Sequence, residues 1–304
     1  MKKTTLIYNP VAGRKPAKRE RQIREAAKAL TASGLDLTLA ATTGPGDATN
    51  LARRAVAEGA ELVIACGGDG TVNEVLNGLV PGTATLGIFP GGTANIIGKE
   101  LHLPHDPARA ARALPRWKPR RIALGRATWN DVATGEPRSR VFISVAGVGF
   151  DAYIVHSLSW SLKMGWGVIG YGLEAVRQAL RYPFPPFRFE IDGKRSEATF
   201  AVVHRTGHYA GWLPLAPTAN LFKPDFTACL FKSRSRTRYF VYALGIILRQ
   251  HLRFSDVELV DGFKVTCTSV DSGKPIYFEL DGELVGLLPA TFEILPDALT
   301  VLVP

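Results

Sequence analysis

The chain has 304 residues, of which 46% are hydrophobic and 21% charged, and its formal net charge is +10. This length predicts two domains or one large domain, and the composition is ample for a hydrophobic core. The positive charge favours an anionic partner: a membrane surface, a nucleic acid or a nucleotide. No helix-turn-helix, zinc-finger or RNP-like pattern is visible, so we expect no nucleic-acid partner.

The cysteines, the histidines and the first residues exclude other classes. Cys66, Cys229 and Cys267 have no paired spacing, which indicates a reducing compartment. The six histidines lack metal-ligand spacing, so no metal site is predicted from them. The start, MKKTTLIYNP, lacks the apolar stretch of a signal peptide, and no run approaches the ~20 apolar residues of a membrane span. We therefore expect a cytoplasmic protein, soluble or peripheral to a membrane.

The first part of the chain alternates strand-like and helix-like segments. Apolar or alternating runs predict strands at 4–8, 35–41, 62–66 and 84–89. Apolar residues at helical spacing predict a helix at 17–30. They predict a second helix that begins at Asp47, which can cap it, and ends at Gly59. Strands alternating with helices to about residue 115 predict a parallel sheet with helices on both faces, which is a three-layer α/β domain.

The pattern changes after Trp117-Lys118-Pro119. Most later segments are strand-like, and Asp192-Gly193 is a strong hairpin signal. We expect strands at 121–127, 141–145, 187–191, 198–204, 227–231, 257–259, 263–268, 276–280 and 290–303, and helical insertions at 157–180 and 236–252. The second part is therefore predicted to be an antiparallel β-sandwich with two helical insertions.

Residues 61–79 carry the clearest chemical signal. An apolar strand-like run is broken by three glycines, at 67, 68 and 70, and a helical pattern follows. Glycine lets backbone N–H groups approach an anion closely, and a helix N-terminus adds its positive dipole end, so the loop predicts a phosphate site. Asp69 would repel a phosphate, which suggests that this residue manages a cation or a proton.

Part of this stretch also has a structural explanation. Thr71-x-x-Glu74 matches a capping box, so both residues could serve only to start the helix. For these two residues the structural and functional interpretations are equally supported, whereas the double glycine followed by Asp69 favours a function. The loop matches neither the P-loop nor the dinucleotide fingerprint.

The segment GGDGTVNEVLNG resembles the nucleotide-binding signature of the diacylglycerol kinase catalytic family, which includes sphingosine and ceramide kinases and bacterial lipid kinases. NAD kinases share the GGDGT core. Further motifs match in the family's order over nearly the whole chain: an N-P turn, a threonine before G-D-A, P-G-G-T-A-N at 90–95 and G-x-G-F-D at 147–151.

The resemblance implies an ATP site in the first domain. The matching nucleotide contacts are Asn9, Pro10, Gly13, Thr42, Gly67, Gly68, Asp69, Gly70, Thr71, Val72, Asn73 and Thr93. Taken singly, Asn9-Pro10 is an ordinary turn and Thr93 and Asp151 are plausible helix caps. Taken together, the motifs favour nucleotide binding.

Asp281-Gly282-Glu283 lies between two alternating segments and is by itself a standard hairpin turn. The resemblance implies a catalytic role, with Glu283 as the general base that accepts the proton of the acceptor hydroxyl. The transferred phosphate must be held in line, with its charge offset by cations and backbone donors. Asp69 would bind Mg²⁺ or orient the acceptor, two roles that stay open, and Asp281 would assist either group.

Two positions depart from the glycerolipid branch of the family. That branch has a D-D-G-Y turn with an acidic residue for a structural Mg²⁺, whereas Phe222-Lys223-Pro224-Asp225 places Lys223 there. Asp225 could substitute only with a shift of register. The branch also has Asn-Asp where this chain has Asn95-Ile96. Both departures favour an acceptor other than simple diacylglycerol.

Two features suggest contact with lipid. The segment 158–173 is unusually apolar and aromatic and could line an acyl-chain cleft or touch a bilayer, although packing in the core is slightly favoured. Basic clusters at 14–24, 116–121 and 234–238 could meet anionic lipid at ~1 kcal/mol per basic residue. For any one cluster, a solvated face is the commoner explanation.

These observations predict an ATP-dependent lipid kinase that uses Mg²⁺ and meets its lipid at the membrane surface. Residues 1–118 would form the nucleotide-binding domain and 119–289 the lipid-substrate domain, with the active site in the cleft between them. The resemblance implies that residues 290–304 return to complete the first domain. A soluble-substrate kinase such as NAD kinase and a non-catalytic nucleotide- or lipid-binding sensor are the alternatives. The acceptor lipid and the oligomeric state, a homodimer included, stay open.

Overall fold

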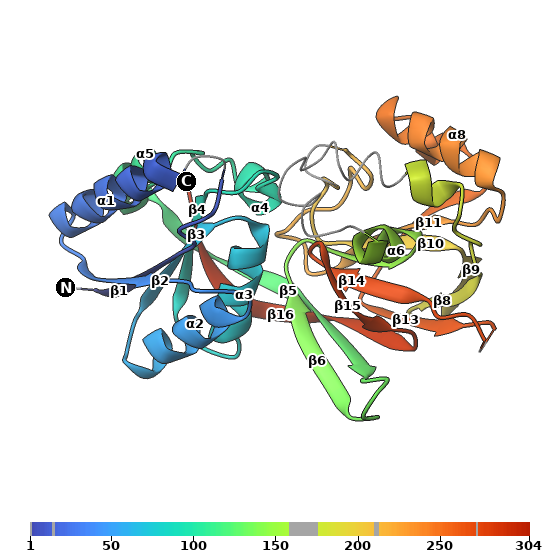
Figure 1. Cartoon of the computed structure of the whole chain (residues 1–304), viewed down its shortest axis with the longest axis horizontal. Coiled ribbons are helices and arrows are strands. Elements are labelled where there is room, and N and C mark those ends of the chain that lie inside the picture. Colours follow the sequence, from blue (N-terminus) through green and yellow to red (C-terminus); the bar gives the residue numbers. More distant parts are fainter. Residues whose placement is uncertain (1, 14–15, 158–175, 210–212, 272) are drawn as a thin grey trace. The chain divides into compact units, whose positions relative to one another are not determined.

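The computed structural model describes residues 2–13, 16–157, 176–209, 213–271 and 273–304 (Figure 1). The chain forms two compact units: unit 1 comprises Met1–Leu124 and Pro296–Pro304, and unit 2 comprises Gly125–Leu295. The chain passes between the units within two long strands, β5 (Lys118–Asn130) and β16 (Ala290–Val303). The apolar segment 158–173 lies outside the described residues. None of the described helices combines the length and the apolar character needed to cross a membrane.

Unit 1 is built on a parallel sheet. Its strands are β1 (Lys3–Tyr8), β2 (Asp36–Ala41), β3 (Leu62–Gly67) and β4 (Thr85–Pro90), in the order β2-β1-β3-β4, with the end of β16 beside β4. The connecting helices are α1 (Pro16–Ala32), α2 (Asp47–Ala57) and α3 (Asp69–Leu79), followed by α4 (Ile96–Glu100), α5 (Pro107–Ala113) and the short η1 (Leu114–Arg116).

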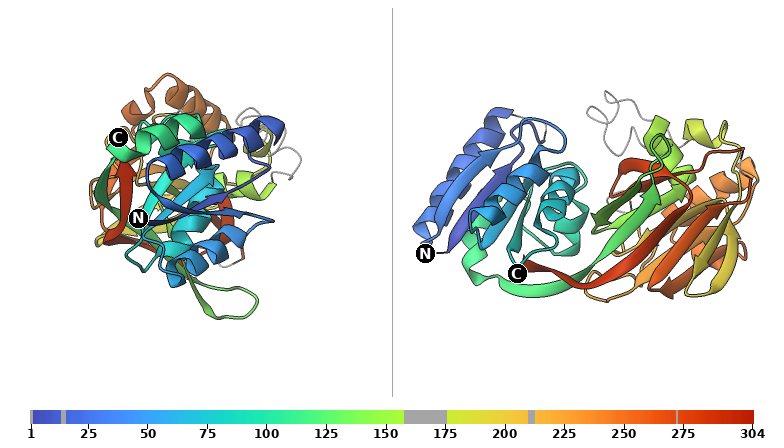
Figure 2. Two further views of the ribbon diagram at one scale, coloured as in Figure 1. Left: turned by 90° about the vertical axis from the view of Figure 1, so that its left-hand side faces the viewer. Right: turned by 90° about the horizontal axis from the view of Figure 1, so that it is seen from below.

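The helices of unit 1 cover both faces of this sheet. The connection from β1 to β2 runs in one direction along the sheet, and the connections from β2 to β3 to β4 run in the other. Right-handed crossovers therefore place α1 on the face opposite to α2 and α3. In agreement, α1 packs on α5 and α2 packs on α3 (Figures 1 and 2). This arrangement confirms the predicted three-layer α/β domain.

Unit 2 is a sandwich of two antiparallel sheets. One contains β16, β13 (Lys264–Ser269), β8 (Phe187–Ile191), β9 (Lys194–Ala198) and the hairpin of β5 with β6 (Pro137–Phe142). The other has the order β12 (Val257–Gly262), β11 (Phe226–Phe231), β10 (Phe200–His204), β7 (Val145–Gly149), β14 (Tyr277–Leu280) and β15 (Glu283–Leu287). Helices α6 (Phe150–Ser157) and α8 (Arg236–Ile247) and the turn η2 (His251–Arg253) are insertions.

Aromatic side chains fill the core of the sandwich. Phe142 stacks on Phe226, and both Phe142 and Phe278 meet the edge of Phe292. All four side chains are fully buried. The second sheet carries another buried cluster on its outer face, where α6 and α8 cover it. The predicted antiparallel β-sandwich is therefore confirmed. Helix α8 and the turn η2 correspond to the insertion expected at 236–252, whereas most of the insertion expected at 157–180 lies outside the described residues.

The structure corrects one predicted strand. The expected strand 141–145 is divided between β6 and β7, which belong to different sheets. The chain bends between them because Asp281 accepts hydrogen bonds from the backbone N–H groups of Ile143, Ser144 and Val145, at 3.0, 2.8 and 3.0 Å. A side chain more than 130 residues away along the sequence thus fixes this bend, which local pattern alone does not reveal.

Two predicted helix N-caps are wrong, whereas Gly59 follows the C-cap of α2 with a φ of 87° and ends this helix as expected. Helix α2 begins after Gly46, and the carboxylate of Asp47 accepts from the backbone and the hydroxyl of Thr43. Helix α3 begins after Gly68, so Thr71 is already inside the helix and forms no capping box. Glu74 instead accepts from the backbone N–H groups of Gly46 and of Ala48 in α2, at 2.9 and 3.1 Å. A carboxylate of α3 therefore satisfies the orphan donors at the start of its neighbour.

Gly78 allows the close approach of α2 and α3. A Cβ atom there would overlap the carbonyl oxygen of Thr49 and lie 2.6 Å from the Cβ of Ala52. Alanine normally stabilises a helix by about 1 kcal/mol relative to glycine. Because it must push the helices apart here, we expect Gly78→Ala to lower the free energy of unfolding by roughly 1–3 kcal/mol. Urea denaturation measures this, with Gly44→Ala in open space as the control; a more stable Gly78→Ala protein would contradict the packing.

Candidate functional site

The predicted nucleotide contacts lie along one edge of unit 1. The strands pair in register, so that Tyr8 lies beside Ala41 and Cys66, and Gly67 lies beside Pro90. Parallel strands end at the same edge, and ligands of open α/β sheets bind outside these carboxyl ends. The edge brings together Asn9, Pro10 and Gly13 after β1, Thr42 after β2, Gly67 to Asn73 at the end of β3 and start of α3, and Thr93 after β4.

Not every predicted contact is turned to this edge. Asn73 is fully buried, and its side-chain oxygen accepts from the Asn77 amide at 3.2 Å. The Asn9 side chain accepts from the backbone N–H of Val11 at 3.0 Å and so closes its own turn. Thr93 is exposed, but it is not the predicted cap, because Asn95 occupies the N-cap position of α4.

Two glycine loops touch each other at the centre of the edge. Gly91 donates to the carbonyl oxygen of Gly67 at 2.7 Å. A Cβ atom on Gly92 would lie 2.5 Å from the Cα of Gly68, whereas a Cβ on Gly68 would lie 3.3 Å from the Cα of Gly92. The backbones therefore approach more closely than any side chain at Gly92 would allow.

Asp69 and Asn95 hold these loops in place. The Oδ1 atom of Asp69 accepts from the backbone N–H of Ile96 at 2.7 Å, which ties the first glycine loop to the start of α4. Asn95 closes the second loop by bonding both the N–H and the carbonyl oxygen of Gly92, each at 2.8 Å. Sequence reasoning assigned Asp69 to a cation or a proton and missed this backbone contact.

Arg19 is a buried cation that the sequence analysis left within an exposed basic cluster. Only 3% of this residue is exposed. Its guanidinium donates to the carbonyl oxygens of Cys66 at 2.6 Å and of Asn9 at 3.4 Å, and Gly91 lies against it. Burial raises the pKa of the Cys66 thiol to about 11, so the group beside Arg19 stays neutral. Helical spacing could have revealed Arg19, because it shares the buried face of α1 with Ile23, Ala26 and Leu30.

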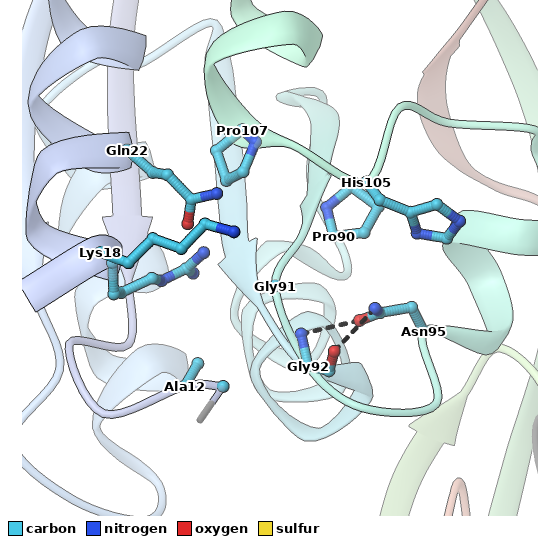
Figure 3. A pocket seen from close by; sticks show the side chains of 11 residues that line it. Ala12, Lys18, Gln22, Pro90, Gly91, Gly92, Asn95, His105 and Pro107 are labelled. Atoms are coloured by element: carbon cyan, nitrogen blue, oxygen red, sulfur yellow. Dashed lines mark hydrogen bonds between the residues drawn. The ribbon is translucent and has the colours of Figure 1, made fainter. Parts of the chain in front are cut away.

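A pocket of about 400 Å³ opens beside Arg19, between α1 and the loop that follows β4 (Figure 3). Lys18 and Gln22 of α1 lie on one side of it, and Asn95 and His105 on the other. The backbones of Gly13, Gly91 and Gly92 complete the lining, which contains two cations and no acidic residue. The pocket is therefore electrostatically suited to an anion.

The D-G-E turn of unit 2 is a rigid structural feature. Asp281 and Gly282 have positive φ angles of 50° and 85° and connect β14 to β15. The carboxylate of Asp281 is the acceptor of the three backbone N–H groups at 143–145. Glu283 follows as the first residue of β15, half-buried, with its Oε2 atom 2.6 Å from the Arg140 guanidinium of β6. Arg140 was not foreseen from the sequence.

A pair of buried carboxyl groups lies next to this turn, and one of them accepts a hydrogen bond from it. Glu279 and Asp151 are 1% and 2% exposed. Glu279 accepts from the N–H of Gly282 at 2.5 Å, and Asp151 accepts from the Tyr209 hydroxyl. Burial and the charge of Asp151 raise the pKa of Glu279 well above its ordinary value. This shift favours the protonated form of Glu279, which can donate a hydrogen bond to Asp151.

The turn that would carry a structural Mg²⁺ in the glycerolipid branch holds a guanidinium in this chain. The buried Arg205 donates to the carbonyl oxygens of Leu221 at 2.8 Å, of Lys223 at 2.6 Å, and of Asp225. Burial lowers the pKa of Arg205 to about 10, so it stays charged at neutral pH. Among the described residues, no group of three or more His, Cys, Asp or Glu side chains could hold a metal. The turn does not fit the accessory metal of the glycerolipid branch.

Known protein families match both parts of the chain. The profile of the diacylglycerol kinase catalytic domain matches residues 3–127. The profile of the YegS C-terminal NAD kinase beta sandwich-like domain matches residues 144–303. Solved structures agree: a diacylglycerol kinase from Bacillus anthracis superposes with a TM-score of 0.77 at 25% identity, covering 100% of this chain and 97% of that one. Yeast NADH kinase superposes with a TM-score of 0.54 at 10% identity, covering 99% of this chain and 82% of that one. This likeness shows a shared fold alone.

Curated relatives extend over the whole length. The diacylglycerol kinase of Bacillus subtilis strain 168 is 28% identical over 309 residues, which covers 100% of this chain and 97% of the relative. The diacylglycerol kinase of Staphylococcus aureus strain MRSA252 is 30% identical over 308 residues, covering 100% and 93%. The resemblance found in the sequence is thereby confirmed: the chain belongs to the diacylglycerol kinase family.

Proposed function

We propose that this protein transfers the γ-phosphate of ATP to the hydroxyl group of a lipid. Membership of the diacylglycerol kinase family indicates a kinase. The observation that carries the proposal is the carboxyl edge of unit 1, where the glycine loops, the buried Arg19 and an acid-free pocket meet. Backbone donors, a helix N-terminus and fixed cations are the groups that bind a polyphosphate.

The glycine loop at 67–70 would supply the phosphate contacts, and Lys18 and Arg19 would offset the negative charge. Asp69 is the acidic residue of this loop. One carboxylate at this edge fits a Mg²⁺ ion held mainly by phosphate oxygens and water, which is the usual coordination of Mg²⁺ on nucleotides. When bound, Mg²⁺ would supply positive charge that offsets the developing charge on the transferred phosphate.

Glu283 would act as the general base of the transfer. It accepts the proton of the lipid hydroxyl while the hydroxyl oxygen bonds to the γ-phosphorus and the bond from that phosphorus to the bridging oxygen of ADP breaks. Arg140 orients the carboxylate through their 2.6 Å ion pair. Asp281 and Glu279 fix the turn through backbone N–H groups, which makes them positioning residues in this proposal.

Replacement of the base tests the reaction class. Glu283→Gln is expected to bind ATP but to transfer phosphate about 10²–10⁴ times more slowly, because the amide cannot accept the hydroxyl proton. Labelled ATP, Mg²⁺ and a mixed lipid extract provide the assay, and the labelled product names the acceptor. The matched control is Glu190→Gln, which removes a carboxylate that is ion-paired with Arg195 at 2.8 Å elsewhere in unit 2. Wild-type turnover in Glu283→Gln would remove this residue from the mechanism, and label in NAD rather than lipid would reassign the substrate.

The contact between the glycine loops predicts which of two substitutions weakens ATP binding more. Gly92→Ala must separate the loops, so we expect ATP affinity to fall roughly tenfold to a hundredfold, corresponding to an overpacking cost of about 1–3 kcal/mol. Gly68→Ala is expected to weaken ATP binding less, because its Cβ has 3.3 Å to the nearest atom. Equilibrium binding of ATP measures both effects. Gly207→Ala, with 3.5 Å to the nearest atoms, is the control, and equal affinity of Gly92→Ala and wild type would refute the loop assignment.

The shared proton of Glu279 predicts a dependence of stability on pH. Because the pKa of Glu279 is raised in the folded protein, its stabilising contribution is complete below the ordinary glutamate pKa and is lost as pH rises toward the folded value. Glu279→Gln keeps an acceptor for Gly282 and a donor for Asp151 without titrating. We expect wild type, but not Glu279→Gln, to lose free energy of unfolding from this site over the pH range above the ordinary glutamate pKa of ~4.3. Urea denaturation across this range checks it; parallel pH profiles of the two proteins would disprove the shared proton.

A further inference from the structure

Helix α8 has an apolar face on each side. Tyr239 and Tyr242 point inward and are 5% and 2% exposed, within the cluster on the outer face of the second sheet. The opposite face carries five large apolar side chains whose exposed fractions lie between 38% and 59%: Phe240, Val241, Leu244, Ile247 and Leu248. Leu252, which is 40% exposed, extends this apolar stripe beyond the end of the helix. Their spacing of i, i+1, i+4, i+7 and i+8 places them on one stripe of the helix.

Such a stripe is not needed for folding, because the inward face already covers the sheet. Figure 1 shows α8 along the periphery of unit 2. Contiguous large apolar side chains on a surface, with a polar rim, mark an interaction site. The charges around the stripe indicate which kind of partner covers it.

The rim of the stripe is basic. Residues 232–255 contain six lysine and arginine residues and neither aspartate nor glutamate. Three of these cations have acidic partners: Lys232 with Glu258, Arg234 with Glu197 and Arg238 with Asp256. The other three, Arg236 before the stripe and Arg249 and Arg253 after it, are exposed and form no ion pair with any described residue.

We propose that α8 and the turn that follows it form the surface by which this protein docks on an anionic lipid bilayer. The apolar stripe enters the region between headgroups and acyl chains, and the arginines at both ends reach lipid phosphates. A second copy of this chain is a poorer partner, because it would bring the same cations against one another on a protein of net charge +10. The inference rests on the proposed function, which requires access to a lipid, but binding is measurable without turnover.

Co-sedimentation with vesicles tests the apolar stripe. Wild type is expected to bind phosphatidylcholine vesicles that contain phosphatidylglycerol. The double variant Leu244→Ser/Ile247→Ser should bind them at least roughly tenfold more weakly, since two apolar side chains no longer enter the bilayer. Both positions are more than half exposed, so the fold should be unaffected. The matched control is Leu39→Ser, on β2 of unit 1, where the leucine is 47% exposed.

A second pair of variants tests the basic rim. Arg249→Gln and Arg253→Gln should each weaken binding by about fivefold and reduce its dependence on salt, because each removes one contact with anionic headgroups. Arg53→Gln, an exposed arginine on α2, should bind like wild type. Vesicles of pure phosphatidylcholine should bind wild type weakly. Equal binding to both vesicle types would refute the proposed contacts between the arginines and anionic headgroups.

Other outcomes would overturn the inference. Failure of wild type to bind anionic vesicles, or wild-type binding by Leu244→Ser/Ile247→Ser, would show that α8 is not the docking surface. A wild-type dimer that this double variant converts to a monomer, with vesicle binding unchanged, would assign the stripe to a second copy. A protein that binds vesicles through α8 but phosphorylates no lipid would refute the proposed function and support the surface. With a short-chain form of the lipid that the labelled-extract assay identifies, dissolved as monomers, the double variant should turn over like wild type.

Discussion

The carboxyl edge of the sheet in unit 1 depends on two loops that touch through their backbones at Gly68 and Gly92. This contact leaves no room for side chains, so the loops are held from their margins, by Asp69 on Ile96 and by the guanidinium of Arg19 on the end of β3. A phosphate would therefore meet backbone donors whose positions are already set. Preorganised donors cost little rearrangement during a reaction, which is the main contribution that a protein makes to phosphoryl transfer.

Most of the fold of unit 1 follows from local pattern, because its strands and helices are neighbours in sequence and parallel strands must end at one edge. The family resemblance assigned the N-P turn, the GGDGT loop and the P-G-G-T-A-N loop to one nucleotide site, and the parallel strands bring these loops to one edge. Contacts made across the fold were not predictable in this way. Glu74 reaches a neighbouring helix, and Asp281 fixes a bend at Ile143 to Val145. Arg19 was missed for a different reason. It was grouped with the charged residues around it, although its helical spacing places it on the buried face of α1.

The second unit combines familiar elements with unusual polar contacts. Its D-G-E turn matches the family, and the hairpin explanation and the catalytic explanation are compatible, since the turn geometry places Glu283 at the start of β15. The departure at Lys223 also has a physical counterpart. Where the resemblance implies a divalent ion in the glycerolipid branch, Arg205 of this chain supplies a fixed positive charge to three carbonyl oxygens. An internal cation of this kind is independent of the metal concentration around the protein.

The carboxyl pair beneath the turn restricts how this sequence can change. A Cβ atom on Gly147 would lie 2.6 Å from the Oε1 atom of Glu279 and would also overlap the carboxylate of Asp151. Any larger residue at this position therefore requires both buried carboxyl groups to shift or to be replaced by smaller side chains. The cost of replacing Gly147 should consequently depend on the residues at positions 151 and 279, so that changes at these three positions are not additive.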